Sequence, residues 1–149
     1  MKEKLFISEE IPSDYTLEMF EELHPSPLRW DLEYKKECLN LSNYKGFWLI
    51  NYDTKNILSE LIISWENESI ANLDSIGTFL EYRKRGYSKV LLEYSIGWLK
   101  SQGFLYYEGN ARKEGGSWAL NKQFGAIKID ELENYHNTGE IYIHYKIKL

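Results

Sequence analysis

The stretch that decides the fold is Thr78-Phe79-Leu80-Glu81-Tyr82-Arg83-Lys84-Arg85-Gly86-Tyr87-Ser88, where an apolar strand pattern passes into a helix pattern. The first backbone N–H groups of a helix have no acceptor within it, and the helix dipole favours an anion there. Gly86 allows close approach of an anion to the backbone, and Ser88 is too small to block it. Positive charge is added by Arg83, Lys84, Arg85 and Lys89. The segment predicts a phosphate or pyrophosphate site, with a solvated basic helix start as the alternative.

This loop does not match the common nucleotide-binding motifs. Gly86 is its only glycine, so it is neither a Walker A loop nor a dinucleotide-binding GxGxxG loop. The pattern after it, from Arg85 to Gln102, is a helix with two apolar stripes, which suits packing against a sheet. Gly103 stands where a C′ glycine ends a helix, and a strand follows at 104–108. Strand, helix and strand in this order predict two parallel strands joined by a right-handed crossover.

The remaining patterns predict a mixed α+β domain. A helix capped by Ser13-Asp14 runs to about Leu23, and others span 31–41 and 117–124. Strands are expected at 4–7, 47–52, 57–65, 70–80, 126–132 and 140–149, the last alternating strictly between apolar and polar residues. The short turns at 53–56 and 66–69 indicate an antiparallel meander. We therefore expect a single domain over 1–149, a mostly antiparallel sheet with one parallel crossover and helices on both faces.

Composition limits the class of protein. The chain has 149 residues, 43% hydrophobic and 28% charged, which fits one globular domain and excludes dominant disorder. A net charge of −5 argues against a general nucleic-acid binder. No apolar run approaches a membrane span or a signal peptide, so we expect no membrane association and a cytoplasmic protein. Cys38 is the only cysteine and the three histidines lie far apart, so neither an internal disulfide nor a metal site is expected.

Residues 82–88, Tyr-Arg-Lys-Arg-Gly-Tyr-Ser, resemble the acetyl-CoA-binding motif of the GNAT (GCN5-related) N-acetyltransferases. That motif reads Arg/Gln-x-x-Gly-x-Gly/Ala and is often preceded by Tyr. Residues 119–126, Ala-Leu-Asn-Lys-Gln-Phe-Gly-Ala, resemble the second motif of the family, a short helix that closes on Leu/Phe-Gly-Phe. The close resemblance covers about residues 70–126, and the order of the other predicted elements also fits the family.

The resemblance implies that acetyl-CoA is a cosubstrate. Its pyrophosphate would lie on the amides of Arg83 to Ser88, and its pantetheine arm would pair with the strand backbone before the loop. An acceptor amine would attack the thioester carbonyl directly, with both reactants held together. The cofactor-binding residues carried over in this way are Ile76, Thr78, Leu80, Arg83, Lys84, Arg85, Gly86, Tyr87, Ser88 and Asn121.

The attacking amine must lose a proton, so a carboxylate is useful at the site. The family often places an acidic residue on the strand before the loop, and Asp74 aligns with that place. Strand alternation predicts that Asp74, Ile76 and Thr78 share one face. The alternative is that Asp74 is only a hydrogen-bonded polar residue. Weaker candidates, expected to be solvated charges, are Glu60, Glu66 and Glu68.

Two positions depart from the family pattern. Asn121 stands where many members have a Tyr that protonates the leaving thiolate, so Ser117, Tyr107 or Tyr135 would replace it, or water would. Ser88 stands where Gly or Ala is usual, and its hydroxyl would add a hydrogen bond to a phosphate.

The function expected from these residues is N-acetylation of a primary amine on a small molecule or a protein. Negative charge at the site would favour a cationic acceptor. Two other interpretations stay open: an acyl-CoA-binding or partner-binding module without turnover, and an RNA-directed acetyltransferase, against which the acidic charge counts. The loop at 24–30 is a candidate specificity loop. The last strand is expected to lie at a sheet edge, where it would allow homodimerisation.

Overall fold

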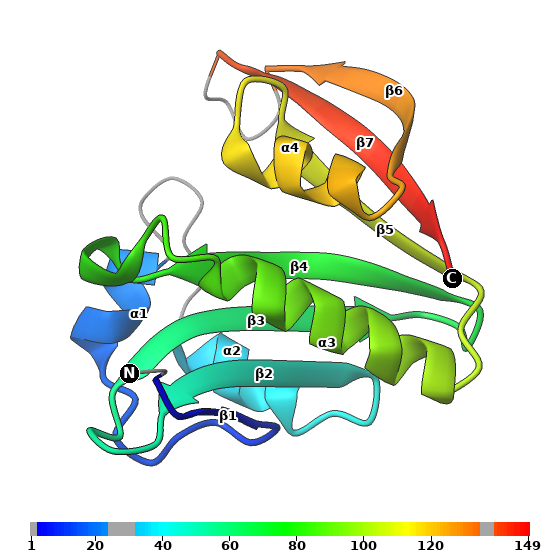
Figure 1. The fold of residues 1–149 in the computed structure, drawn as a ribbon. Helices are drawn as coiled ribbons and strands as arrows, with labels where there is room; N and C mark the ends of the chain where they lie inside the picture. The colour runs from blue at the N-terminus through cyan, green and yellow to red at the C-terminus, as the bar shows by residue number, and fades with distance from the viewer. Residues whose placement is uncertain (1–2, 24–31, 135–138) are drawn as a thin grey trace. The chain divides into compact units, whose positions relative to one another are not determined.

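The computed structural model describes residues 3–23, 32–134 and 139–149, and the chain divides into two compact units (Figure 1). The candidate specificity loop, as well as Tyr135, lies outside the described residues. The first unit comprises 1–64 and 74–95, and the second comprises 65–73 and 96–149. The expectation of a single domain stays a prediction.

The order of the elements is the one predicted from the sequence. The first unit contains β1 (Leu5–Ser8), α1 (Leu17–Leu23), α2 (Leu32–Leu39), β2 (Tyr44–Asn51), β3 (Ile57–Trp65) and the short 3₁₀ helix η1 (Leu80–Tyr82). The second contains β5 (Tyr106–Arg112), α4 (Gly116–Gln123), β6 (Ile127–Glu133) and β7 (Ile141–Lys148). β4 (Ile70–Thr78) and α3 (Tyr87–Ser101) each contribute to both units. The strand order of the sheet is β1-β2-β3-β4-β5-β7-β6.

Helices cover both faces of the sheet in the first unit (Figure 1). Glu60 of β3 binds Lys35 of α2, so the face that carries Glu60 lies under α2. Phe47 of β2 packs against Tyr94 of α3, with ring centroids 5.5 Å apart. The opposite face of the sheet therefore lies under α3. β2 and β3 pair antiparallel, as the short turn at 53–56 predicted, and β1 also pairs antiparallel with β2. The core on the α1 and α2 side consists of Tyr15, Phe20, Trp48, Ile50, Ile57 and Phe79.

The ends of several elements differ from the prediction for local reasons. Thr16 caps α1, since its Oγ1 accepts from the N–H of Met19 at 3.2 Å, so the predicted Ser13-Asp14 cap is wrong. β4 ends at Thr78 because η1 begins at Leu80. α3 begins at Tyr87, two residues later than predicted. Its C-terminal glycine is confirmed: Gly103 has φ +89°, and the N–H of Phe104 donates back to the carbonyl of Leu99 at 3.1 Å.

In the second unit, β4 and β5 are parallel, as the crossover predicted. Their ladder pairs Ile70, Ala71 and Asn72 with Tyr106, Tyr107 and Glu108. β7 pairs with β5 on one side and with β6 on the other. The expectation that the last strand forms a sheet edge is therefore wrong, because β7 lies between β5 and β6, and β6 forms the edge. Homodimerisation through β7 loses its structural basis.

α4 lies against the β7 face that carries Tyr145, whose ring is 5.9 Å from that of Trp118. Gly115 is the N-cap of α4 and has no side chain to accept a hydrogen bond, and the helix begins at Gly116, one residue before the predicted start. The described helices include none that is long and apolar enough to cross a membrane.

Candidate functional site

The loop that connects β4 to α3 is shaped for an anion. Lys84 has φ +65° and Gly86 has φ +82°, so left-handed residues alternate within it. Such alternation turns neighbouring N–H groups into a concave anion-binding arrangement. The N–H of Arg83 donates to Leu80 and the N–H of Val90 to Gly86. Between them, no backbone N–H of residues 84–89 donates to another residue in the described part of the chain.

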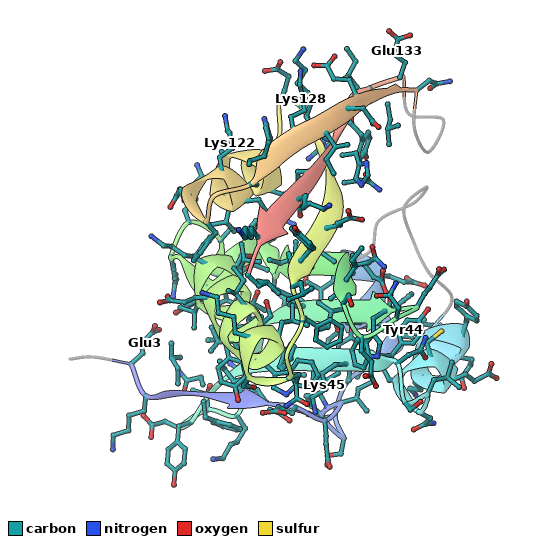
Figure 2. The ribbon with its side chains drawn as sticks, turned by 90° about the vertical axis from the view of Figure 1, so that its right-hand side faces the viewer. Glu3, Tyr44, Lys45, Lys122, Lys128 and Glu133 are labelled. Atoms are coloured by element: carbon teal, nitrogen blue, oxygen red, sulfur yellow. The ribbon has the colours of Figure 1, made fainter. Side chains whose placement is uncertain are left out.

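Glu3, which Figure 2 labels at the N-terminal end of the described chain, contacts two residues of this segment. Its carboxylate accepts from the hydroxyl of Tyr87 and is 3.9 Å from the guanidinium of Arg85. The hydrogen bond to Glu3 raises the pKa of Tyr87. The Arg85 guanidinium is also 5.9 Å from the centre of the Tyr82 ring. The Arg85 pair is about half exposed on both sides, so it is weak, and a phosphate would compete with it.

The other predicted cofactor-binding residues lie around the same loop. Thr78 ends β4, and its carbonyl accepts from Arg83 Nε at 3.0 Å. Ser88 lies in the first turn of α3, and its Oγ is 2.7 Å from Thr78 Oγ1. Leu80 is exposed, with 67% of its surface accessible, whereas Phe79 beside it is buried.

Asp74 and Thr78 lie on opposite faces of the sheet, so the prediction that they share a face is wrong. Thr78 Oγ1 is 2.9 Å from Ser59 Oγ, whereas Asp74 accepts a hydrogen bond from Ser64. Ser59 and Ser64 are five residues apart on β3 and therefore on opposite faces. The alternation of β4 must be interrupted once between Asp74 and Thr78, as an inserted bulge residue does.

The face that carries Asp74 also carries a polar cluster that sequence reasoning did not assemble. Cys38 of α2 is buried and has hydrogen-bond contacts with the hydroxyls of Tyr34 and Tyr44. The charge of Asp74 also contributes to raising the pKa of both hydroxyls. Burial, with the hydrogen bond to Cys38 as a smaller cause, raises the pKa of Tyr44 to about 12. The spacing of Tyr34 and Cys38 places them on one helix face, but only the sheet order brings Tyr44 and Asp74 to them.

The Asp74 carboxylate itself is incompletely satisfied. Its Oδ2 is buried and has no hydrogen-bond partner among the described residues. Burial raises the pKa of Asp74 to about 6, and the hydrogen bond from Ser64 opposes that rise in part. A carboxylate with this pKa is mostly ionised at pH 7 and still basic enough to take up a proton.

A second carboxylate on the same face, Glu60, is buried and has a full set of partners. Its Oε1 binds the ammonium of Lys35, and its Oε2 accepts from Trp48 Nε1 at 2.8 Å. The ammonium is also 3.5 Å from the hydroxyl of Tyr15. Lys35 and Glu60 are 0% and 1% exposed, so the expectation that Glu60 is a solvated charge is wrong. Burial lowers the pKa of Lys35, and the charge of Glu60 acts against that shift.

The remaining predicted site residues lie in the second unit. Tyr107 of β5 and Asn121 of α4 are both 0% exposed. Asn121 Nδ2 donates to the carbonyl of Ser117 at 2.8 Å and lies 3.4 Å from its hydroxyl. Asn121 Oδ1 is buried without a hydrogen-bond partner among the described residues. The structure thus brings Asn121 and Ser117 together within one helix.

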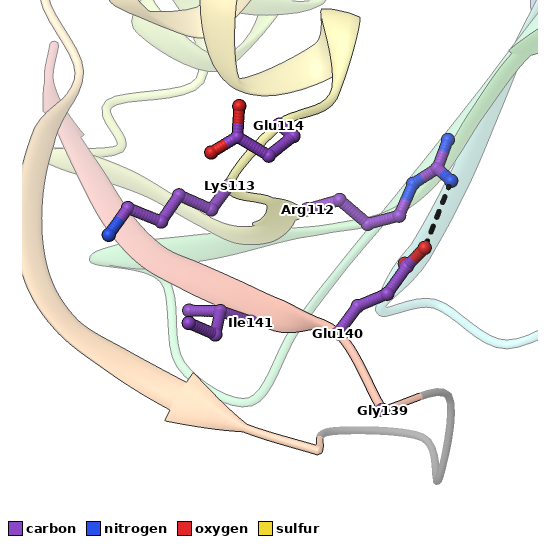
Figure 3. Close-up of a pocket in the computed structure, with 6 residues that line it drawn as sticks. All are labelled: Arg112, Lys113, Glu114, Gly139, Glu140 and Ile141. Carbon is purple, nitrogen blue, oxygen red and sulfur yellow. Dashed lines mark ion pairs between the residues drawn. The ribbon is translucent and has the colours of Figure 1, made fainter.

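The second unit also has a depression of about 350 Å³ between the end of β5 and the start of β7 (Figure 3). An ion pair at its mouth joins Arg112 and Glu140, 3.7 Å apart and about half exposed. Its lining is Arg112, Lys113, Glu114, Gly139, Glu140 and Ile141. None of these is a predicted site residue. Within residues 3–23, 32–134 and 139–149, no group of histidine, cysteine and carboxylate side chains is arranged to hold a metal ion.

Comparison with solved structures identifies the fold. The chain is similar to the ribosomal-protein-S18-alanine N-acetyltransferase of Escherichia coli, with a TM-score of 0.78, 18% identity and coverage of 97% of this chain and 94% of that one. It is similar to a GNAT family acetyltransferase from Elizabethkingia anophelis with acetyl-CoA bound, with a TM-score of 0.77, 14% identity and coverage of 99% and 100%. It is also similar to the spermidine/spermine N-acetyltransferase SpeG of Vibrio cholerae, with a TM-score of 0.77, 12% identity and coverage of 97% and 92%.

The chain therefore has the GNAT acetyltransferase fold, as its motifs predicted. No protein-family model matches the sequence, and no curated protein matches it. At identities of 18% and below, the similarity establishes the fold, and the activity has to be argued from the residues of this chain.

Proposed function

We propose that this protein is an acetyl-CoA-dependent N-acetyltransferase that acts on a primary amine. The observation that carries the proposal is the loop from β4 to α3, where the N–H groups of residues 84–89 donate to no other described residue. The same loop carries the residues that resemble the acetyl-CoA-binding motif of the GNAT family, which supports the proposal. Asp74, a half-buried carboxylate with a raised pKa on the preceding strand, supports turnover in addition to binding.

The loop would hold acetyl-CoA by its pyrophosphate. The N–H groups of residues 84–89 would donate to the phosphate oxygens, and the N-terminal end of the α3 dipole would favour their charge. Arg85 would exchange its weak pair with Glu3 for a phosphate. Arg83 donates its Nε hydrogen to the carbonyl of Thr78, and its other N–H groups would remain available to a phosphate. The backbone of Ile76 would pair with the pantetheine arm.

Asp74 would accept the proton that the amine loses. A primary amine is protonated at neutral pH and has no lone pair for attack until that proton leaves. The unpartnered Asp74 Oδ2 would receive it, directly or through a water molecule. The nitrogen would then attack the thioester carbonyl, and the bond to sulfur would break as the tetrahedral intermediate collapses. The second proton that the nitrogen loses would pass to water and from there to the departing thiolate. The charge of Asp74 would favour a cationic acceptor, either a small molecule or a protein.

Protonation of the leaving thiolate has no obvious donor in this chain. Asn121 is not acidic, and its Nδ2 is bound to Ser117 within α4. A thiol has a pKa near 8.5, so CoA leaves as a thiolate without a general acid and takes a proton from water. Tyr107 and Ser117 stay predictions for this role.

The experiment that tests the proposal is an amine screen with release of free CoA thiol as the readout. Polyamines, lysine, aminoglycosides and peptides with free N-termini would each be mixed with acetyl-CoA and the protein. The proposal predicts release that requires both amine and protein and that falls at least about 100-fold in Asp74→Asn. Glu68→Gln, an exposed carboxylate in the turn before β4, is the matched control and is expected to leave the rate unchanged.

The second candidate function is an acyl-CoA-binding module without turnover. Asn121 favours it, since this position lacks an ionisable group and its side chain is fully buried. This alternative predicts that CoA binds while no amine in the screen releases thiol. A cytoplasmic location remains a prediction from the sequence.

A further inference from the structure

Thr78 is hydrogen-bonded to the segment that follows it through both its backbone carbonyl and its side-chain hydroxyl. Its carbonyl accepts from Arg83 Nε at 3.0 Å, in the middle of the loop. Its Oγ1 is 2.7 Å from the hydroxyl of Ser88, in the first turn of α3. The same Oγ1 is 2.9 Å from the hydroxyl of Ser59 on β3. Residues 79–87 are therefore closed into a ring whose two sides both end on Thr78.

The direction of each hydroxyl hydrogen bond follows from one fixed point. Ser59 Oγ is 2.7 Å from the carbonyl of Gly77, and a carbonyl only accepts, so Ser59 donates its single hydrogen there. Ser59 must then accept from Thr78 Oγ1, which in turn must accept from Ser88 Oγ. The chain of donation runs from Ser88 through Thr78 and Ser59 to the Gly77 carbonyl.

This direction changes the role expected for Ser88. Its hydroxyl hydrogen is donated to Thr78, so the expected hydrogen bond from Ser88 to a phosphate is not supported. Ser59 at the other end is 0% exposed, which protects the chain from competing water. A hydroxyl at position 88, where the family pattern has Gly or Ala, thus ties the start of α3 to the sheet.

We propose that Thr78 is a positioning residue for acetyl-CoA. Through the hydroxyl chain to Ser59 and Ser88, it fixes the loop in the shape in which the N–H groups of residues 84–89 meet the pyrophosphate. The inference rests on the proposed function of the same loop. It assigns Ser59 and Ser88 to the support of the site and not to contact with the ligand.

The test is calorimetric titration of CoA into the wild-type protein and two Thr78 variants. Thr78→Val keeps the shape of the side chain and removes the hydroxyl, so it breaks both hydroxyl contacts. We expect it to bind CoA about tenfold more weakly than wild type, as loss of about one net hydrogen bond would do. Thr78→Ser keeps the hydroxyl and is expected to bind within about twofold of wild type. Ser88→Ala, which breaks one contact, is expected to fall between them.

Thermal denaturation of each variant separates positioning from stability. If Thr78→Val binds CoA as wild type does, whether or not its Tm falls, the hydroxyl chain does not position the loop and the inference is overturned. A tenfold loss in Thr78→Ser also overturns it, because the methyl group would then be the part that matters. If wild type does not bind CoA, it is the proposed function that fails, and the two failures are thereby distinguished.

Discussion

Glu60 and Asp74 are carboxylates on the face of the sheet that α2 covers, but Glu60 is buried, Asp74 is half-buried, and their surroundings differ. Glu60 has the ammonium of Lys35 and the indole of Trp48 as partners. Asp74 has only the hydroxyl of Ser64, and its second oxygen has no partner among the described residues. The first arrangement neutralises its charge and fixes α2 on the sheet. The second leaves a basic atom available, at an energetic cost that the rest of the fold must offset.

The largest effect is expected from Lys35→Met, which leaves Glu60 buried without its cation. Removal of one partner of a buried pair typically costs about 3–5 kcal/mol. Urea denaturation at pH 7.5 would measure the free energy of unfolding. Lys36→Met is the matched control, because Lys36 is 44% exposed and its ion pair with Glu33, at 3.9 Å, is weak. This variant should change the free energy of unfolding by less than about 0.5 kcal/mol. Equal effects in the two variants would contradict the view that the pair of Glu60 with Lys35 stabilises the fold.

Asp74→Asn is expected to separate chemistry from binding. The variant keeps the size of the side chain but has no basic oxygen, so kcat should fall at least about 100-fold while the Kd for CoA stays within about twofold. In wild type, kcat/KM should rise with pH through about 6, as Asp74 loses its proton, and the variant should lack this limb. A wild-type rate in Asp74→Asn would contradict the proposal that Asp74 accepts the proton, and would leave it as a hydrogen-bonded polar residue.

The same substitution should increase stability, with an effect that depends on pH. Burial raises the pKa of Asp74 from 3.8 to about 6, so the folded state holds a proton that the unfolded state releases between these values. The stability of wild type relative to Asp74→Asn therefore falls as pH rises from about 4 to 6 and is constant above. The gain in the variant at pH 7.5 is at most about 3 kcal/mol and should vanish near pH 3.5. Denaturation curves at both pH values would measure it, and a gain that does not change with pH would contradict the assigned burial.

The smallest effect contrasts two glycines that have open space around them. Gly86 in the loop has φ +82°, whereas Gly97 lies within α3, and a Cβ at either position would meet no atom within 4 Å. Gly86→Ala should destabilise by about 1–2 kcal/mol, because a left-handed backbone strains a residue with a Cβ. Gly97→Ala should stabilise by about 0.5–1 kcal/mol through helix propensity. Thermal denaturation of both variants would test this, and effects of the same sign would contradict the role given to the Gly86 conformation.

Much of the fold could be predicted from the sequence, because its signals are local. Helix periodicity, the glycine at 103 and the alternation of the last strand each depend on a few neighbouring residues. The place of β7 inside the sheet could not be predicted, since it depends on the pairing of β7 with β5, a strand distant in sequence. The interrupted alternation of β4 was also invisible, because polar and apolar residues are mixed along this strand and none of them marks an inserted residue.

The candidate site was predictable to the same extent. The loop from Arg83 to Ser88 could be predicted from its basic residues and from Gly86. The side chains around Asp74 come from α2, β2 and β3, so only the folded chain brings Tyr34 and Tyr44 near its charge. The burial of Glu60 depends on Lys35, 25 residues away, and a lone glutamate in a strand pattern does not indicate it.

The most direct test of the account is calorimetric titration of acetyl-CoA into the wild-type protein, Gly86→Asp and Lys100→Glu. Gly86→Asp places a negative charge in the anion-binding loop, whereas Lys100→Glu changes charge on the exposed surface in the last turn of α3. The account predicts micromolar binding by wild type and Lys100→Glu, and a loss of at least about 100-fold in Gly86→Asp. Absence of binding by wild type at millimolar acetyl-CoA, or equal binding by all three, would contradict the claim that this loop holds the cosubstrate.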